Sequence, residues 1–133
     1  MTQTFSFTRW TPTHRSTQHP ARCSKPAGTL YVTSQILCEF YSVVTNARRV
    51  QNPCSPAAAI AAISSLLAFL RVLPVPTHTV EELIRLLRRR PVTGSDIFDL
   101  QILATMNVNG IQRIYTFNAA DFVSFREIAV LTP

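Results

Sequence analysis

Residues 96–106, with the sequence DIFDLQILATM, carry apolar side chains on nearly every side of one predicted helix. A helix that is hydrophobic all round is normally buried in the core of a domain. Its first turn nevertheless holds Asp96 and Asp99, which are three residues apart and so lie on one face. A buried carboxylate needs a cation, hydrogen-bond donors or an opposite charge. This stretch therefore predicts a core helix with an acidic end.

Two interpretations fit the acidic end of this helix. Ser95 or Asp96 is a suitable N-cap, and Asp99 lies in a first turn that favours negative charge. Alternatively, the two aspartates are ligands of a metal ion. On this helix alone capping is the favoured interpretation, and the choice depends on where the other acidic residues lie.

From residue 28 onward, β-prone runs alternate with amphipathic helices. The predicted elements are strands at 30–33, 71–75, 113–117 and 128–131, helices at 34–46, 56–70, 79–90 and 96–109, and a turn or short helix at 118–122. Ser34 is the expected N-cap of one helix, and Thr79 with Glu82 forms the capping box of another. Pro74 predicts that its strand lies at a sheet edge. The alternation predicts an α/β fold with a mostly parallel sheet.

Residues 1–27 have a different composition, with Arg9, Arg15, Arg22 and Lys25 but no acidic residue. We expect a basic, poorly ordered segment at 1–27, followed by one domain at 28–133. The formal net charge of +6 allows a nucleic-acid partner, an acidic protein partner or a ribosome-associated structural role.

The cysteine pattern bears on the cellular compartment. Three cysteines without C-x-x-C spacing favour a reduced, cytoplasmic chain, and no secretory signal is visible. The apolar run Ala57–Leu70 is too short to span a bilayer, so no membrane partner is expected. His14, His19 and Cys23 match no standard zinc motif.

Three acidic residues fall at one predicted edge of the sheet. Glu39 lies on the helix entered from the strand at 30–33, Asp121 follows the strand at 113–117, and Asp99 begins the buried helix. Ligands of open parallel sheets bind beyond the carboxyl ends of the strands. Clustered carboxylates repel one another unless a cation neutralises them, and oxygen-only ligands favour Mg²⁺ or Mn²⁺. The pattern predicts a divalent metal site.

Three segments, in this order, resemble the PIN domain of VapC-type toxins. They are LYVTSQILCEF at 30–40, DIFDLQILAT at 96–105 and YTFNAADF at 115–122, and the resemblance covers about Gly28 to Pro133. It implies a three-layer αβα sandwich and a Mg²⁺-dependent endoribonuclease that is inhibited by an antitoxin protein. It assigns catalytic and metal-binding roles to Glu39, Asp99 and Asp121. It adds Asp96 as an accessory metal ligand and Thr116 and Asn118 as supporting polar residues.

One part of the family pattern is missing. PIN domains open with a strand that is normally central in the sheet and ends in Asp-Thr/Ser-Asn, and its Asp is the first metal ligand. No acidic residue precedes Glu39 here. The resemblance therefore leaves two functions open: a weakly active, truncated endoribonuclease, or a degenerate module that binds an antitoxin or RNA without cleaving. It also allows a homodimer. Phe5, Phe7 and Trp10 have the pattern of a surrogate strand.

Overall fold

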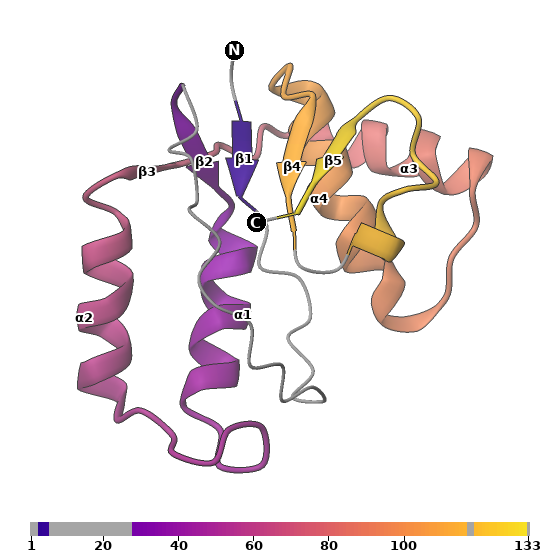
Figure 1. The fold of residues 1–133 in the computed structure, drawn as a ribbon. Coiled ribbons are helices and arrows are strands. Elements are labelled where there is room, and N and C mark those ends of the chain that lie inside the picture. Colours follow the sequence, from indigo (N-terminus) through magenta and orange to yellow (C-terminus); the bar gives the residue numbers. More distant parts are fainter. Residues whose placement is uncertain (1–2, 6–27, 117–118, 133) are drawn as a thin grey trace.

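The computed structural model describes residues 3–5, 28–116 and 119–132 (Figure 1). Its elements are, in chain order, β1 (Gln3–Phe5), β2 (Leu30–Val32), α1 (Ser34–Val44), α2 (Pro56–Leu66), β3 (Leu70–Val72), α3 (Thr79–Arg89), the short 3₁₀ helix η1 (Gly94–Asp96), α4 (Ile97–Val108), β4 (Arg113–Tyr115), a second 3₁₀ helix η2 (Ala119–Asp121) and β5 (Ala129–Leu131). Strands alternate with helices, and this confirms the predicted α/β fold.

The five strands form one parallel sheet in the order β3-β2-β1-β4-β5. The strand predicted at 71–75 is the edge strand β3, as expected, although Pro74 follows it rather than lying within it. Because parallel strands need long crossovers, the connection from β2 to β3 carries α1 and α2 across a face of the sheet, and the connection from β3 to β4 carries α3 and α4.

The helices cover both faces of this sheet, which makes three layers. Crossovers between parallel strands are almost always right-handed. The connection from β2 to β3 runs one way across the sheet, and the connection from β3 to β4 runs back the other way. These two connections therefore place α1 and α2 on one face and α3 and α4 on the other. Figure 1 shows the two helix pairs as separate groups.

Strand β1 lies at the centre of the sheet. Thr4 pairs with Tyr31 of β2 on one side and with Ile114 of β4 on the other. The predicted surrogate strand is thus present over Gln3–Phe5, whereas Phe7 and Trp10 lie outside the described residues. The position that the family pattern gives to its opening strand is filled, but by a strand without an acidic residue. The predicted domain boundary at residue 28 stays a prediction.

Two predicted helix caps are wrong. Thr33, not Ser34, caps α1: its extended backbone lets its hydroxyl oxygen accept a hydrogen bond from the Ile36 amide at 3.2 Å. The capping box of Thr79 and Glu82 does not form, because α3 begins at Thr79 itself and the preceding His78 has helical rather than extended backbone angles. The Thr79 hydroxyl is buried and has no hydrogen-bond partner among the described residues.

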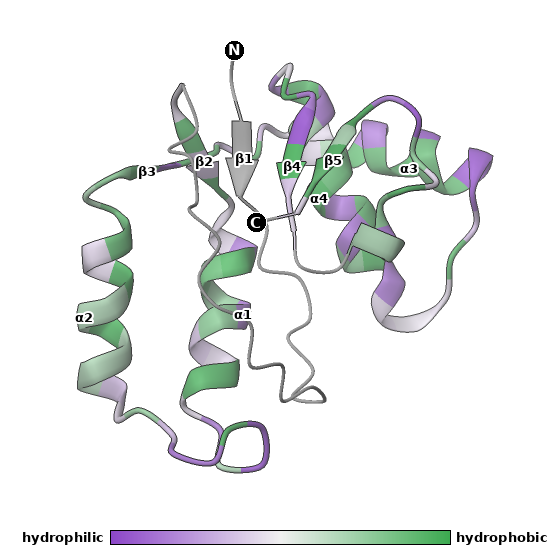
Figure 2. Cartoon of the chain, viewed as in Figure 1, coloured by the Kyte–Doolittle hydropathy of each residue, from purple (hydrophilic) through white to green (hydrophobic). Residues whose placement is uncertain are grey.

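The predicted length of the second helix is also wrong. α2 ends at Leu66 instead of Leu70, because residues 67–69 turn and Leu70 joins β3 beside Leu30. The helix is mostly apolar, as Figure 2 shows, yet only Ala59 in it is buried. The side chain of Ile60 is 58% exposed. Apolar composition therefore does not place α2 in the core.

Helix α4 does form the core, as its sequence predicts. Its fully buried side chains are Leu100, Ile102, Leu103, Ala104, Thr105 and Met106. All of these except Thr105 pack in one cluster with Val32 of β2, Ile36 of α1 and Ile114 of β4. This packing fixes the amino-terminal end of α4 against the end of β2 where α1 begins. Among the described residues, no helix combines the length and apolar composition that crossing a membrane requires.

Candidate active site

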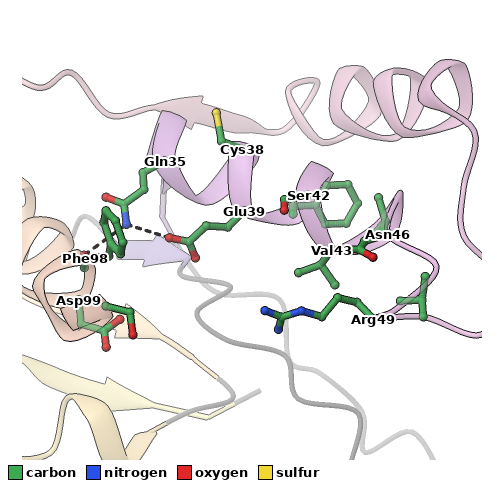
Figure 3. Close-up of a pocket in the computed structure, with 13 residues that line it drawn as sticks. Gln35, Cys38, Glu39, Ser42, Val43, Asn46, Arg49, Phe98 and Asp99 are labelled. Carbon is green, nitrogen blue, oxygen red and sulfur yellow. Dashed lines mark hydrogen bonds between the residues drawn. The ribbon is translucent and has the colours of Figure 1, made fainter.

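A pocket of about 680 Å³ lies between α1 and the start of α4 (Figure 3). The described residues that line it are Gln35, Cys38, Glu39, Phe40, Ser42, Val43, Val44, Asn46, Arg49, Val50, Ser95, Phe98 and Asp99. Two of the predicted site residues, Glu39 and Asp99, are in its wall. Because α1 directly follows β2, the pocket lies at the carboxyl edge of the parallel sheet, where ligands of such folds bind.

Glu39 is held by the helix that carries it. The side-chain amide of Gln35, one helical turn earlier, donates a hydrogen bond to Glu39 Oε1 at 2.9 Å. The same amide nitrogen lies 3.3 Å from the carbonyl oxygen of Phe98 and donates to it. One amide therefore orients the carboxylate and joins α1 to the first turn of α4.

Asp99 lies in the first turn of α4, on a different side from the buried Leu100. Its neighbour Phe98 is 50% exposed and faces the pocket. Asp96 occupies the N-cap position of α4, but its side chain makes no capping hydrogen bond there. Its backbone is helical rather than extended, because η1 runs directly into α4. The interpretation of Asp96 as a side-chain cap is therefore wrong.

Asp121 lies on η2, just beyond the carboxyl end of β4. Its side chain is half-buried, and that of Thr116 is fully buried. Asp121, Asp99 and Thr116 each interact with other groups of the protein. Asp121 and Thr116 are not among the described residues that line the pocket of Glu39 and Asp99. Asn118 lies outside the described residues.

A metal ion held by the protein needs several ligand side chains around one point. The described residues contain no group of three or more His, Cys, Asp or Glu side chains that could hold one. Two carboxylates do share a pocket, and Mg²⁺ commonly takes only one or two protein carboxylates together with water and substrate phosphates. The four-acid site of Glu39, Asp96, Asp99 and Asp121 stays a prediction.

Among the residues that line the pocket, Gln35, Arg49 and Phe98 were not assigned to the site from the sequence. Gln35 could have been found, because it lies four residues before Glu39 on the same helix face. Phe98 was assigned to the buried surface of an all-round apolar helix. Arg49 lies in the loop after α1, and nothing in its local sequence indicates that it lines the same pocket as Asp99.

A family model for the PIN domain matches residues 12–130, which is most of the chain. The chain belongs to the PIN domain family. The match begins ahead of residue 28, where the resemblance in the quoted segments begins.

The PIN fold of this chain is also that of a solved toxin. The crystal structure of VapC20 from Mycobacterium tuberculosis, a toxin that cleaves the sarcin–ricin loop, is similar with a TM-score of 0.54 and 24% sequence identity. The similarity covers 73% of this chain and 71% of that one. A comparison with curated proteins finds no match. At this identity the likeness establishes the fold and leaves the chemistry to be argued from the residues.

Proposed function

We propose that this PIN domain is a divalent-metal-dependent endoribonuclease of the VapC toxin type. The observation that carries the proposal is that Glu39 and Asp99, from α1 and α4, line one pocket at the carboxyl edge of the sheet. Membership of the PIN family and the likeness to the fold of VapC20 support it. In this proposal the partners are RNA, as substrate, and a cognate antitoxin protein, both in the cytoplasm.

Glu39 and Asp99 are the residues that would hold Mg²⁺ or Mn²⁺, with Asp121 and Asp96 as further acidic residues of the proposed site. When bound, the ion supplies a lowered pKa for an attacking water and charge stabilisation at the phosphate. The side chains of the protein supply the orientation of the ligands. Gln35 fixes the orientation of the Glu39 carboxylate. Thr116 and Asn118 are the supporting polar residues that the family resemblance implies.

The walls of the pocket also bear on the proposed hydrolysis. Most of the wall around the two carboxylates is apolar, with Phe40, Val43 and Phe98 among its residues. Such a wall excludes water from the flanks of the reacting phosphate, which strengthens electrostatic interactions inside the pocket. The reaction proposed is attack of water on an RNA phosphodiester and departure of the ribose oxygen.

A non-catalytic module that binds RNA or an antitoxin is the second candidate. The observation that favours it is the sequence of β1, Gln3-Thr4-Phe5, which fills the central strand position without the acidic residue of the family pattern. Loss of a ligand weakens metal binding and disturbs the alignment of the attacking water, where small misplacements are costly. If the chain is a nuclease, we therefore expect it to cleave RNA slowly; a non-catalytic module would not cleave at all.

The deciding experiment measures cleavage of single-stranded RNA by the purified full chain, with Mg²⁺ and with EDTA. We expect slow cleavage that EDTA abolishes and that Asp99→Asn reduces at least about tenfold, as loss of groups at metal sites does. Glu81→Gln is the control, because Glu81 is an exposed acidic residue of α3 outside the pocket. Cleavage that Asp99→Asn leaves unchanged would exclude this site. RNA or antitoxin binding without any Mg²⁺-dependent cleavage would establish the second candidate instead.

A further inference from the structure

The pocket is elongated along α1, and its ends differ in chemistry. Figure 3 shows Phe98 and Asp99 at one end, Asn46 at the other and Glu39 between them, and the side chain of Arg49 reaches from the Asn46 end toward the middle. From Gln35 to Val44, the last residue of α1, the helix advances about 14 Å, at the usual rise of about 1.5 Å per residue. A ligand that fills the pocket is therefore longer than a single phosphate group.

Arg49 brings a positive charge into the pocket from the end that lies beyond α1. Its backbone amide donates a hydrogen bond to the carbonyl oxygen of Asn46 at 2.9 Å, so a tight turn after α1 holds the residue in place. The ion pairs between described residues are Arg85 with Glu82 and Arg89 with Glu127, so Arg49 forms no ion pair with any described carboxylate. A guanidinium group is planar, always charged and well matched to phosphate oxygens.

Phe98 brings an exposed aromatic ring to the other end. Its ring is 50% exposed, although the neighbouring Leu100 is 1% exposed. The Gln35 hydrogen bond to its carbonyl oxygen fixes the backbone that carries the ring. An unpaired nucleobase stacks on such a ring whatever its identity, because every base has a π-face.

We infer that this pocket binds an unpaired stretch of RNA, with a base stacked on Phe98 and a backbone phosphate held by Arg49. The inference rests on the proposed function, in which the phosphate between these contacts is the one hydrolysed near Glu39. An acidic protein segment would also pair with Arg49, but the proposed hydrolysis near Glu39 favours RNA as the occupant of this pocket. A duplex fits less well, since its bases are stacked within the helix and do not present a face to Phe98.

The test measures binding of a short fluorescein-labelled single-stranded RNA by fluorescence anisotropy, in EDTA, as a function of salt concentration. Arg49→Ala should weaken binding and lower the slope of log K against log salt by about 0.7, the value for one phosphate contact on a single strand. Phe98→Ala should weaken binding about fivefold or more and leave the slope unchanged. The same RNA annealed to its complement should bind with no dependence on Phe98.

Each variant has a matched control. Arg48→Ala removes the same charge from the adjacent position, which is exposed and outside the pocket lining. Phe69→Ala removes a ring that is 63% exposed after α2 and also outside the lining. Because Arg49 and Phe98 are both exposed, the Arg49→Ala and Phe98→Ala variants should unfold at the same temperature as their control variants.

The outcomes separate this inference from the proposed function. The RNA-binding inference would be overturned if Arg49→Ala and Arg48→Ala changed RNA affinity equally. It would also be overturned if Phe98→Ala weakened the binding of duplex and single strand equally. Either result would stand even where Asp99-dependent cleavage is observed. Binding that depends on Arg49 and Phe98, in a chain that does not cleave, would support the inference and remove the nuclease proposal alone.

Discussion

The side-chain amide of Gln35 donates a hydrogen bond to the carbonyl oxygen of Phe98, 63 positions later in the chain, at 3.3 Å. The same amide nitrogen donates to Glu39 Oε1 at 2.9 Å. Gln35 thus connects the helix that carries Glu39 with the turn that carries Asp99. In the proposed site it is a positioning residue, because it orients the carboxylate of Glu39.

Gln35→Leu should weaken Mn²⁺ binding about tenfold, because hydrogen-bond partners of metal ligands typically contribute that much or more to metal affinity. Titration with Mn²⁺, followed by electron paramagnetic resonance, measures the affinity. Gln51→Leu is the control, since Gln51 is exposed in the loop after α1. A purely structural role for Gln35 would lower the temperature of thermal unfolding and leave the Mn²⁺ affinity unchanged.

Thr4→Pro should destabilise the fold strongly, because β1 lies between β2 and β4. Proline has no amide hydrogen and is tolerated in sheets only at edges or bulges, whereas Thr4 pairs on both sides. We expect a loss on the order of 3 kcal/mol in the free energy of unfolding, comparable to proline in a helix interior. Urea unfolding measures it. Thr4→Val, which keeps the amide and suits a strand, should stay near the parent chain; equal stability of the two variants would contradict a central β1.

Glu82 should make stability depend on pH. Its pKa is lowered from 4.5, chiefly by the Arg85 side chain, which donates hydrogen bonds at 2.6 and 2.7 Å, and also by a hydrogen bond from Asn107, while burial opposes the shift. A lowered pKa in the folded state contributes stability that is present above about pH 4.5 and is lost as the pH falls through the folded-state pKa.

The parent chain should therefore exceed Glu82→Gln in the free energy of unfolding at pH 7, and the difference should shrink on acidification below pH 4.5. Urea unfolding at a series of pH values measures the difference. The exposed Glu81→Gln controls for removal of one negative charge from α3. A difference that grows on acidification would show that the assigned sign is wrong.

Hydrophobic period and composition were sufficient to predict most elements and the parallel α/β class. The burial of α4 was evident from residues 97–106 alone, because a helix that is apolar all round is normally buried in the core. Element ends were less predictable. Thr33 and Ser34 are both good capping residues, and only the backbone angles at the helix start decide between them.

The sequence by itself determined the acidic residues available to the site and the absence of any acidic residue before Glu39. It also determined the segments that resemble the PIN family, since those depend on local order along the chain. The tertiary structure decided which acidic residues meet. Packing of α4 against the sheet brings Asp99 to the pocket that Glu39 lines, and the turn after α1 brings Arg49 to the same pocket. Long-range contacts of this kind follow from the handedness of crossovers and from core packing, neither of which is encoded in local sequence patterns.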